Sequence, residues 1–364
     1  MSSHLRHCFG GMPVLITGHT GFKGSWLAIW LRELGAQVIG YSLAAPTTPS
    51  NFALSGLAGR IEDIRGDVRD SQMIKEIVAY YRPVTIFHLA AQPIVLDSYA
   101  APQATFETNV NGTINVLEAI RQTDSVRVAV LITTDKVYEN REWLWGYREN
   151  EPLGGYDPYS ASKAMAELAI GAYRQSYFSG RNTAIASARA GNVIGGGDFA
   201  NFRLLPDCMR ALAAGQPVLV RHPQSVRPWQ HVLESLSGYL WLAVQLLGQG
   251  QAFAEGWNFG PAEWQAITTQ MVVEKAIALW GNGQWLASRP GQSSPKETHT
   301  LRLNWEKAAN RLDWRPVYNW EQAVEATVEW FKGYGSGRDS YTLCVEQIKH
   351  YSQQAQKANL PWSL

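Results

Sequence analysis

The sequence predicts an α/β fold built on a doubly wound parallel sheet, with a smaller α/β part interleaved with it. Three observations predict this fold: short apolar runs alternate with helical patterns from the start of the chain, the runs are suited to burial on both faces, and a glycine-rich turn joins the first run to the first helix. The 364 residues are enough to bury a large core.

The expected elements follow one another in order along the first half of the chain. Strands are expected at residues 14–16, 38–41, 84–89, 128–132 and 184–188. Helices are expected at residues 25–34, 71–81, 105–121 and 158–175. After Gly191 the pattern loosens, and stretches rich in glycine or proline at 195–197 and 227–228 predict loops. The second part is therefore expected to be assembled from several insertions.

The composition is that of an ordinary globular protein, with 46% apolar and 17% charged residues and a net charge of +1. This balance predicts neither a nucleic-acid nor a membrane partner, and no apolar stretch is long enough to span a bilayer. Residues 1–12 lack a signal-peptide core, so a cytoplasmic location is expected. Cys8, Cys208 and Cys344 lack metal-ligand spacing, so no metal site or disulfide framework is predicted. The 15 tryptophans are expected to serve packing.

A glycine-rich segment, TGHTGFKG at residues 17–24, lies where the first strand meets the first helix. Glycines at this point let a pyrophosphate approach the amino end of the helix closely. No acidic residue ends the second strand to bind a ribose, so the motif alone does not separate NAD from NADP. His19 and Lys23 occupy positions that are commonly small or apolar. We expect a Rossmann-type dinucleotide site that includes Gly18, His19, Thr20, Gly21, Phe22 and Lys23.

Other short segments fit the same site. Asp67 and Val68 follow a short strand and are expected near the adenine. Asn109 is expected to tie the edge of the site together, and for Asp67 and Asn109 a helix cap or a structural hydrogen bond competes with direct contact. Two further strands end at the carboxyl edge where cofactors lie, and they add Leu89, Ala90, Ala91, Gln92 and Thr133.

Five residues are expected to carry the chemistry: Thr134, Asp135, Lys136, Tyr159 and Lys163. Tyr159 and Lys163 are four positions apart on a helix and share a face, so Lys163 can hold a nicotinamide ribose while its charge eases ionisation of the Tyr159 phenol. Tyr159 thereby becomes a candidate general base. Simple hydride transfer does not need Asp135 and Lys136, so their presence predicts the further proton transfers of an elimination.

These segments together resemble the extended short-chain dehydrogenase/reductase family, whose members bind a nicotinamide dinucleotide and a nucleotide sugar. The match runs from Val14 to about Trp330. The dTDP-glucose 4,6-dehydratases within that family are similar but carry Glu where this chain has Lys136. The resemblance implies NAD as the cofactor, CDP-D-glucose as the substrate, and a homodimer or dimer of dimers as the assembly. More narrowly, the chain resembles the nucleotide-sugar 4,6-dehydratases that act on CDP-D-glucose in segments 18–24, 133–138, 145–149 and 153–159.

The resemblance also implies roles for the five residues. Tyr159 takes the proton of the sugar's C4 hydroxyl while hydride passes to NAD+, and Thr134 hydrogen-bonds the reacting oxygen. The 4-ketone acidifies the C5 hydrogen, water leaves across C5 and C6, and hydride returns to C6. Asp135 would protonate the leaving hydroxyl and must then be neutral, which burial favours. Lys136 would be the C5 base, or would stay charged and stabilise the enolate.

Substrate contacts are expected beyond the strand at 184–188. Asn192 is a candidate for the sugar diphosphate, and Arg227 is expected to clamp phosphate because a guanidinium fork suits that task better than an ammonium. Ser98 is expected to contact the substrate, although Leu96 and Asp97 stand where the resemblance implies arginine. Three further cations have two possible roles: they add charge or read the nucleotide, or they are solvated surface groups. These cations are Arg203, Arg221 and Lys296.

The domain boundaries follow from these assignments. The dinucleotide-binding domain is expected at 12–191 and 231–258, the substrate-binding domain at 192–230 and 259–330, and a C-terminal helical extension at 331–364. An amphipathic helix at 341–358 favours packing on its own subunit over a role in assembly. The competing functions are a nucleotide-sugar epimerase or net oxidoreductase, and a non-catalytic dinucleotide sensor on the same fold.

Overall fold

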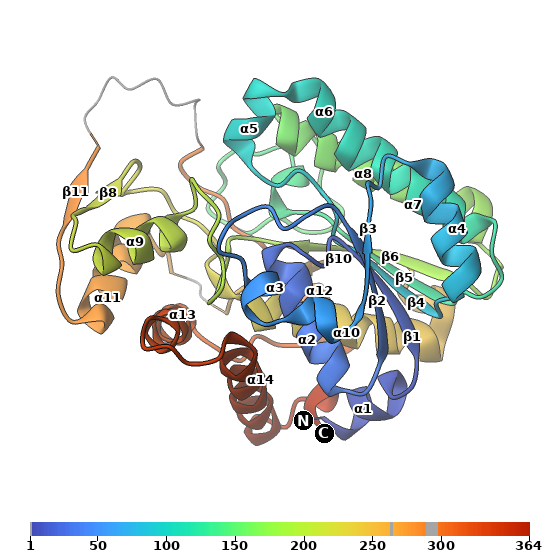
Figure 1. Cartoon of the computed structure of the whole chain (residues 1–364). Helices are drawn as coiled ribbons and strands as arrows, with labels where there is room; N and C mark the ends of the chain where they lie inside the picture. The colour runs from blue at the N-terminus through green and yellow to red at the C-terminus, as the bar shows by residue number, and fades with distance from the viewer. Residues whose placement is uncertain (1, 263–264, 289–297) are drawn as a thin grey trace.

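A seven-stranded parallel sheet forms the centre of the computed structural model, which describes residues 2–262, 265–288 and 298–364 (Figure 1). Its strand order is β10-β6-β5-β4-β1-β2-β3. The chain therefore runs outward from β1 to one edge and then from β4 to the other, which confirms the doubly wound sheet. The strands are β1 Pro13–Thr17, β2 Gln37–Ser42, β3 Glu62–Arg65, β4 Thr85–His88, β5 Val128–Ile132, β6 Ala184–Ala190 and β10 Gly256–Phe259.

Successive residues of the central strands point into two different cores. Val14 and Ile16 of β1 join the core beneath α2 (Phe22–Glu33) and α10 (Val232–Gln249), whereas Leu15 joins the core on the opposite face. The opposite core also holds Ile74 of α4 (Ser71–Tyr81) and Val116 of α7 (Gly112–Arg121). Helix α8 (Pro158–Tyr173) lies beside α7 on that face (Figure 1). The central strands β1, β4 and β5 are thus buried on both sides, as their continuous apolar runs predicted, whereas the edge strand β3 is partly exposed.

Side-chain caps set the starts of two helices that matter for the site. The Asp70 carboxylate accepts from the backbone N–H of Met73 at 3.0 Å, and α4 begins at the next residue, Ser71. The Asp157 carboxylate accepts from the N–H of Ser160 at 2.9 Å, and Pro158 takes the first position of α8. Tyr159 therefore stands in the first turn of a firmly capped helix.

The helix predicted at 105–121 is longer than expected and is not uniform. It starts with α6 (Pro102–Phe106), passes through a π-helical turn at Glu107–Asn111 and continues as α7. The helix predicted at 158–175 likewise ends in a π-helical turn, Arg174–Phe178. Single π-turns of this kind are not visible in a hydrophobic period.

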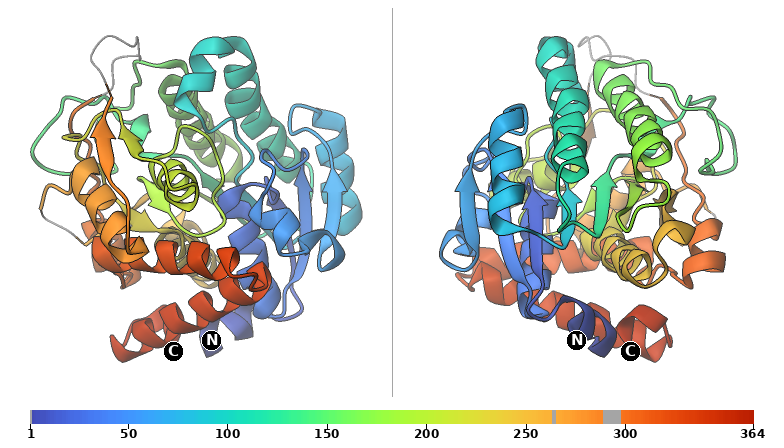
Figure 2. Two further views of the ribbon diagram at one scale, coloured as in Figure 1. Left: turned by 60° about the vertical axis from the view of Figure 1, so that its left-hand side comes forward. Right: turned by 90° about the vertical axis from the view of Figure 1, so that its right-hand side faces the viewer.

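A smaller part lies beside the sheet, on the left of Figure 1, and the left-hand view of Figure 2 brings it forward. Two short sheets belong to the chain after Gly191, because β8 pairs with β11 and β7 pairs with β9. The expected domain boundaries stay a prediction. The elements are β7 Val193–Ile194, α9 Leu204–Ala213, β8 Val218–Val220, β9 Gln230–His231, α11 Thr269–Trp280 and β11 Trp285–Ala287.

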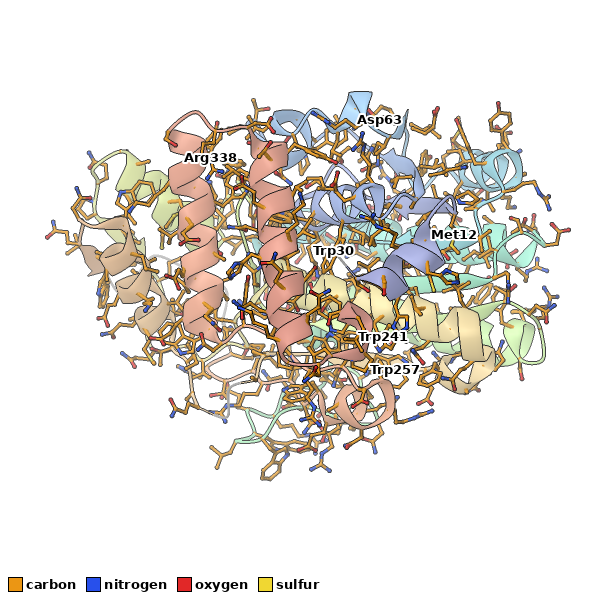
Figure 3. All side chains as sticks on the ribbon, turned by 90° about the horizontal axis from the view of Figure 1, so that it is seen from below. Met12, Trp30, Asp63, Trp241, Trp257 and Arg338 are labelled. Atoms are coloured by element: carbon orange, nitrogen blue, oxygen red, sulfur yellow. The ribbon has the colours of Figure 1, made fainter. Side chains whose placement is uncertain are left out.

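Two C-terminal helices, α13 (Trp320–Gly335) and α14 (Ser340–Lys357), lie side by side, with Arg338 in the turn between them (Figure 3). The ring of Trp30 on α2 lies 6.0 Å from that of Tyr351 on α14, centroid to centroid. The buried Glu234 carboxylate of α10 accepts from the Tyr351 hydroxyl at 2.8 Å. The amphipathic helix therefore packs on its own chain, as predicted.

The remaining helices are short, and the two ends of the described chain meet (Figure 1). The N–H of His4 donates to the carbonyl of Leu364 at 2.9 Å. No helix among the described residues has the length and apolarity needed to cross a bilayer, and no cluster of metal-binding side chains occurs among them. The short helices are α1 Ser3–Phe9, α3 Asn51–Leu54, α5 Val95–Ala100 and α12 Glu306–Leu312. Packing is confirmed for six fully buried tryptophans, whereas Trp145 is 56% exposed. The six are Trp26, Trp30, Trp257, Trp314, Trp330 and Trp362.

Candidate functional site

A cavity of about 720 Å³ lies at the carboxyl ends of the strands and extends to the smaller part of the chain. Gly18 follows β1 and Leu89 follows β4, and both line it. Since β1 and β4 are neighbours from which the chain continues in opposite directions, the cavity lies at the topological switch point, where doubly wound sheets bind ligands.

The glycine-rich turn is shaped by close backbone contacts. Gly18 has a φ of +79°, and a Cβ there would lie 2.6 Å from the backbone nitrogen of Ala90. At Gly24 a Cβ would lie 2.1 Å from the carbonyl oxygen of Gly18. Only glycine permits this approach of helix to strand, so the turn fits a pyrophosphate-binding loop at the amino end of α2.

His19 differs from the prediction, because its side chain is not part of the cavity wall. The imidazole is fully buried, and its Nε2 lies 2.8 Å from a carboxylate oxygen of Asp63 on β3. Its ring packs edge-on against Phe52, at 5.3 Å between centroids. Burial lowers the pKa of His19, with Asp63 opposing that fall. The side chain therefore ties the turn to β3 instead of facing a ligand.

Lys23 does line the cavity. Its ammonium donates to the hydroxyl of Tyr239 at 3.2 Å. Burial, together with the charges of Arg203 and Lys163, lowers the pKa of Lys23 to about 7 against the opposing charge of Asp135. This amine is thus a titratable group within the same charge cluster as the predicted catalytic residues.

Asp135 lies in a short turn directly after β5, where it is buried. One carboxyl oxygen, Oδ1, accepts from the Thr134 hydroxyl at 3.0 Å, while Oδ2 has no hydrogen-bond partner. Burial raises the pKa of Asp135, although the Lys136 cation and the Thr134 hydrogen bond oppose the shift. Lys136 lies at the cavity wall next to it. The prediction of a carboxyl that burial makes easier to protonate is confirmed.

Tyr159 and Lys163 share one face of α8 and both line the cavity, as their spacing predicted. The Lys163 ammonium donates to the carbonyl of Ile132 at 3.0 Å, and burial lowers the pKa of Lys163 to about 8. The expected easing of Tyr159 ionisation by the Lys163 charge stays a prediction. Burial raises the pKa of Tyr159 to about 12, and a hydrogen bond with Thr134 only partly opposes that rise. Desolvation of the phenolate outweighs the attraction of nearby cations.

Two further predicted residues act behind the cavity wall instead of forming it. The buried Ser98 hydroxyl donates to the carbonyl of Val95 and accepts from the N–H of Tyr159 at 3.2 Å, so it holds the start of α8. The prediction that Ser98 contacts the substrate is therefore not supported by its position. Asn109 accepts from the N–H of Gln92 at 2.8 Å and donates to the hydroxyl of Ser162 at 2.8 Å. It ties the edge of the site together, as expected.

The other residues predicted for the dinucleotide lie in the cavity wall. Asp67 is among them, but its carboxylate is paired with Arg69 at 2.6 Å, and this hydrogen bond lowers its pKa. The backbone of Asp67 also accepts from the Tyr41 hydroxyl at 2.8 Å. The remaining predicted residues of the wall are Thr20, Gly21, Phe22, Val68, Leu89, Ala90, Ala91, Gln92 and Thr133.

Three arginines and Asn192 line the part of the cavity nearest to the smaller sheets. Arg203 pairs with Asp198 at 3.0 Å, and Arg221 donates to the carbonyl of Phe202 at 3.1 Å. Arg227 is buried and donates to the carbonyl of Thr298 at 2.7 Å, which fixes its guanidinium in place. Lys296 lies outside the described residues.

The sequence did not reveal several partners of these groups. Tyr239 comes from a distant segment and meets Lys23 only in the folded chain, whereas Asp198 stands five residues before its partner Arg203. The spacing in the sequence could have indicated Glu167 as a partner of Lys163, because it stands four residues after Lys163 on the same helix.

The model of the family described as GDP-mannose 4,6 dehydratase matches residues 15–327. The chain belongs to this family. It is thus a member of the extended short-chain dehydrogenases/reductases, which confirms the resemblance seen in the sequence. The family match spans the cavity and every residue predicted to line it.

Individual proteins and solved structures that resemble this chain give a more specific comparison than the family model. The CDP-glucose 4,6-dehydratase of Salmonella typhimurium is 47% identical over 347 residues, covering 94% of this chain and 96% of that protein. A dTDP-glucose 4,6-dehydratase of Xanthomonas campestris pv. campestris is 28% identical, covering 87% of this chain and 92% of that one. The crystal structure of a Thermus thermophilus UDP-glucose 4-epimerase complex with NAD has a TM-score of 0.72 and 27% identity, covering 88% of this chain and 99% of that one.

Proposed function

We propose that the chain is an NAD-dependent CDP-D-glucose 4,6-dehydratase, which converts CDP-D-glucose into CDP-4-keto-6-deoxy-D-glucose and water. The observation that carries the proposal is the pair Asp135 and Lys136 at the cavity wall, next to Thr134, Tyr159 and Lys163. Hydride transfer at C4 alone needs neither an additional acid nor an additional amine. Elimination across C5 and C6 needs both a proton donor and a means of handling the C5 proton.

The dinucleotide site fits NAD. The Gly18 to Gly24 turn leaves room for a pyrophosphate, and the Lys163 ammonium stands at the cavity wall where it can donate to a ribose hydroxyl. NAD+, when bound, supplies a hydride acceptor at C4 and, once reduced, the hydride donor for C6. The crystal structure of a relative with NAD supports this choice of cofactor.

Tyr159 and Thr134 would act on the C4 oxygen. The Thr134 hydroxyl contacts both the Tyr159 phenol and the Asp135 carboxyl, so it can pass a hydrogen bond to a substrate oxygen placed between them. Because burial holds the Tyr159 pKa at about 12, the phenol must first lose its own proton, and positive charge that arrives with the ligands would favour the phenolate that takes the C4 proton.

Asp135 would protonate the leaving C6 hydroxyl. Its raised pKa keeps the acid form accessible, and its partnerless Oδ2 is the oxygen from which the proton would leave. Lys136 would take the C5 proton or stabilise the enolate. Its position next to the buried carboxyl supports both roles, so the two stay open.

The substrate diphosphate would lie among Asn192, Arg203, Arg221 and Arg227, since a guanidinium fork matches phosphate oxygens. CDP-D-glucose is proposed as the particular sugar nucleotide because the Salmonella typhimurium relative that carries that name covers nearly the whole chain. A 4,6-dehydratase or epimerase acting on another nucleotide sugar is the alternative, favoured by the epimerase that shares this fold.

A homodimer and a cytoplasmic location are part of this proposal. Met165 and Leu168 on α8 are 47% and 63% exposed, which is unusual for neighbouring apolar residues on one helix. A second copy of the chain that packs against α8 would cover them. A water-soluble sugar nucleotide and a recycled dinucleotide are consistent with a reaction in the cytoplasm.

One assay separates the candidate functions. The protein is incubated with NAD+ and CDP-, dTDP-, GDP- or UDP-glucose, and the alkali-dependent absorbance of a 4-keto-6-deoxy sugar is followed together with net NADH. Keto-sugar without net NADH, formed fastest from CDP-glucose, is the expected result. Formation of stoichiometric NADH would refute a dehydratase. Faster turnover of another nucleotide sugar would identify that sugar as the substrate in place of CDP-glucose.

A further inference from the structure

One buried ion pair, Glu167 with Arg189, lies directly behind the predicted catalytic residues. The exposed fractions of the two side chains are 3% and 6%. The guanidinium donates twice to the carboxylate, from Nε to Oε1 at 2.9 Å and from Nη2 to Oε2 at 2.8 Å. A bidentate pair of this kind is rigid as well as strong, because both groups are planar.

The same carboxylate also holds the two central strands next to the cavity. The Thr133 hydroxyl, directly after β5, donates to Oε1 of Glu167. The Ser187 hydroxyl on β6 donates to Oε2 at 2.7 Å. Glu167 belongs to α8, so its carboxylate fixes α8 relative to β5 and β6 at the level of the site.

The guanidinium extends this network past the catalytic turn. Nη1 of Arg189 donates to the Tyr138 hydroxyl at 2.7 Å and to the carbonyl of Glu149 at 3.1 Å. The Tyr138 hydroxyl in turn donates to the side chain of Asn258 on β10 at 2.7 Å. Thr133 and Tyr138 flank residues 134–137, so the segment that carries Thr134, Asp135 and Lys136 is held at both ends by one ion pair.

Glu167 also provides negative charge for the nearby amine. It stands one helical turn beyond Lys163, and both side chains are buried. The Glu167 charge raises the pKa of Lys163 against the larger lowering by burial. Lys23 on α2 and His88 on β4 also interact with Lys163, whose charge lowers the pKa of each.

We propose that Glu167 is a positioning residue that, through Arg189 and Thr133, fixes the turn of Thr134 to Lys136 and keeps Lys163 cationic for dinucleotide binding. The role in keeping Lys163 cationic, here called the charge half, rests on the proposed NAD site. The role in fixing the turn, here called the positioning half, rests on the proposed dehydratase reaction. A carboxylate is required in place of a neutral amide because the Arg189 guanidinium is buried against it, and Lys163 lies one helical turn away on the same buried helix face.

The charge half is tested by dinucleotide binding without any sugar nucleotide. Quenching of tryptophan fluorescence by NAD+ is measured from pH 6 to 10 for the full chain and for Glu167→Gln. The Lys163 cation is lost as the pH rises through about 8, so affinity should fall there. In Glu167→Gln this fall should move down by about one pH unit. Glu346→Gln, which removes an exposed partner of Arg338, is the matched control and should leave the midpoint unchanged.

A folding defect is separated from the charge effect by a second variant. Glu167→Gln leaves the Arg189 cation buried with fewer acceptors, so Glu167→Gln with Arg189→Gln is measured as well. Both variants are first checked by thermal melting. If the single or the double variant is folded and its NAD+ affinity falls at the same pH as that of the parent protein, the charge role of Glu167 is overturned.

The positioning half is tested with Tyr138→Phe, which releases the far end of the turn and leaves every charge in place. Its kcat for keto-sugar formation should fall about 10-fold while KM and the pH midpoint of NAD+ binding stay unchanged. An unchanged kcat overturns this half. If no nucleotide sugar is turned over by the parent protein, the proposed function fails, whereas the pH shift in NAD+ binding still decides the role of Glu167.

Discussion

The Thr134 hydroxyl donates to Oδ1 of Asp135 at 3.0 Å, and the other oxygen of that buried carboxyl has no partner. The carboxyl is therefore oriented by one hydrogen bond and left free at the atom that would exchange a proton. This relationship predicts which step of the proposed reaction depends on Asp135.

Asp135→Asn should lower the rate of keto-sugar formation by about 10²–10⁴-fold, because the amide keeps the shape of the acid but cannot protonate the leaving hydroxyl. The initial reduction of bound NAD+ should persist, since C4 oxidation does not require this acid. Stopped-flow absorbance of NADH and the keto-sugar assay measure the two steps. Asp124→Asn, at an 83% exposed side chain, is the control. Equal loss of both steps would contradict the assigned role.

Lys136 can be assigned by comparing two replacements. If its amine takes the C5 proton, Lys136→Ala should abolish the incorporation of solvent deuterium at C5 of the recovered keto-sugar, and Lys136→Glu should restore a part of it. If the amine is a stabilising cation, Lys136→Glu should be worse than Lys136→Ala, because a carboxylate repels the enolate. Mass spectrometry of the product distinguishes these results. Exchange that is unaltered in both variants would exclude Lys136 from C5 chemistry.

Lys23 should make the folded protein less stable at low pH. Its pKa is lowered from 10.5 to about 7 in the folded chain, so the unfolded chain binds more protons between those values and stability rises with pH across that window. Lys23→Met should therefore raise the free energy of unfolding by about 2 kcal/mol or more at pH 6, and by much less at pH 9. Urea titrations at the two pH values measure the difference. Lys349→Met, at an exposed position on α14, should show no such pH dependence.

Tyr351 should anchor the C-terminal helices. Its hydroxyl donates to the fully buried Glu234 carboxylate, which also accepts from the N–H of Tyr318 at 2.7 Å. Tyr351→Phe should lower the free energy of unfolding by about 1.5–3 kcal/mol, because a hydrogen bond to a buried charge is lost. Tyr80→Phe, at an 80% exposed side chain, is the matched control. Equal melting temperatures for the two variants would show that Tyr351 does not anchor this region.

Leu168 tests the proposed dimer. Leu168→Glu places a charge on the exposed apolar face of α8 and should convert a dimer to monomers in sedimentation velocity experiments. Leu144→Glu, at an 81% exposed leucine in a different segment, should leave the assembly unchanged. A parent protein that sediments as a monomer, or a Leu168→Glu protein that stays dimeric, would remove α8 from the interface.

The main strands and helices were predictable because their signals are local. The helix predicted at 71–81 and the strand predicted at 128–132 have the same bounds in the structure, since Asp70 caps the one and a continuous apolar run defines the other. The π-helical turn at Glu107–Asn111 had no local signal, because its register depends on packing between helices.

The location of a candidate site residue was likewise predictable where the residue directly follows a strand or shares a helix face with another site residue. Thr134, Asp135 and Lys136 follow β5, and Tyr159 and Lys163 share a helix face, so a parallel sheet brings them to one edge. The orientation of His19 and Ser98 was not predictable in this way. Each side chain has a partner far away in the sequence, which is Asp63 for the imidazole and the backbone N–H of Tyr159 for the hydroxyl.

The sequence by itself determined the fold class, the place of the dinucleotide turn and the five residues of the proposed chemistry, because these depend on hydrophobic period, glycine geometry and order along the chain. Only the tertiary structure decided their electrostatics. The pKa of Tyr159 rises to about 12 and that of Lys163 falls to about 8 because burial removes water from both groups. This burial exists only once the chain has folded, and so does the meeting of Arg189 on β6 and Tyr239 on α10 with the groups of the site.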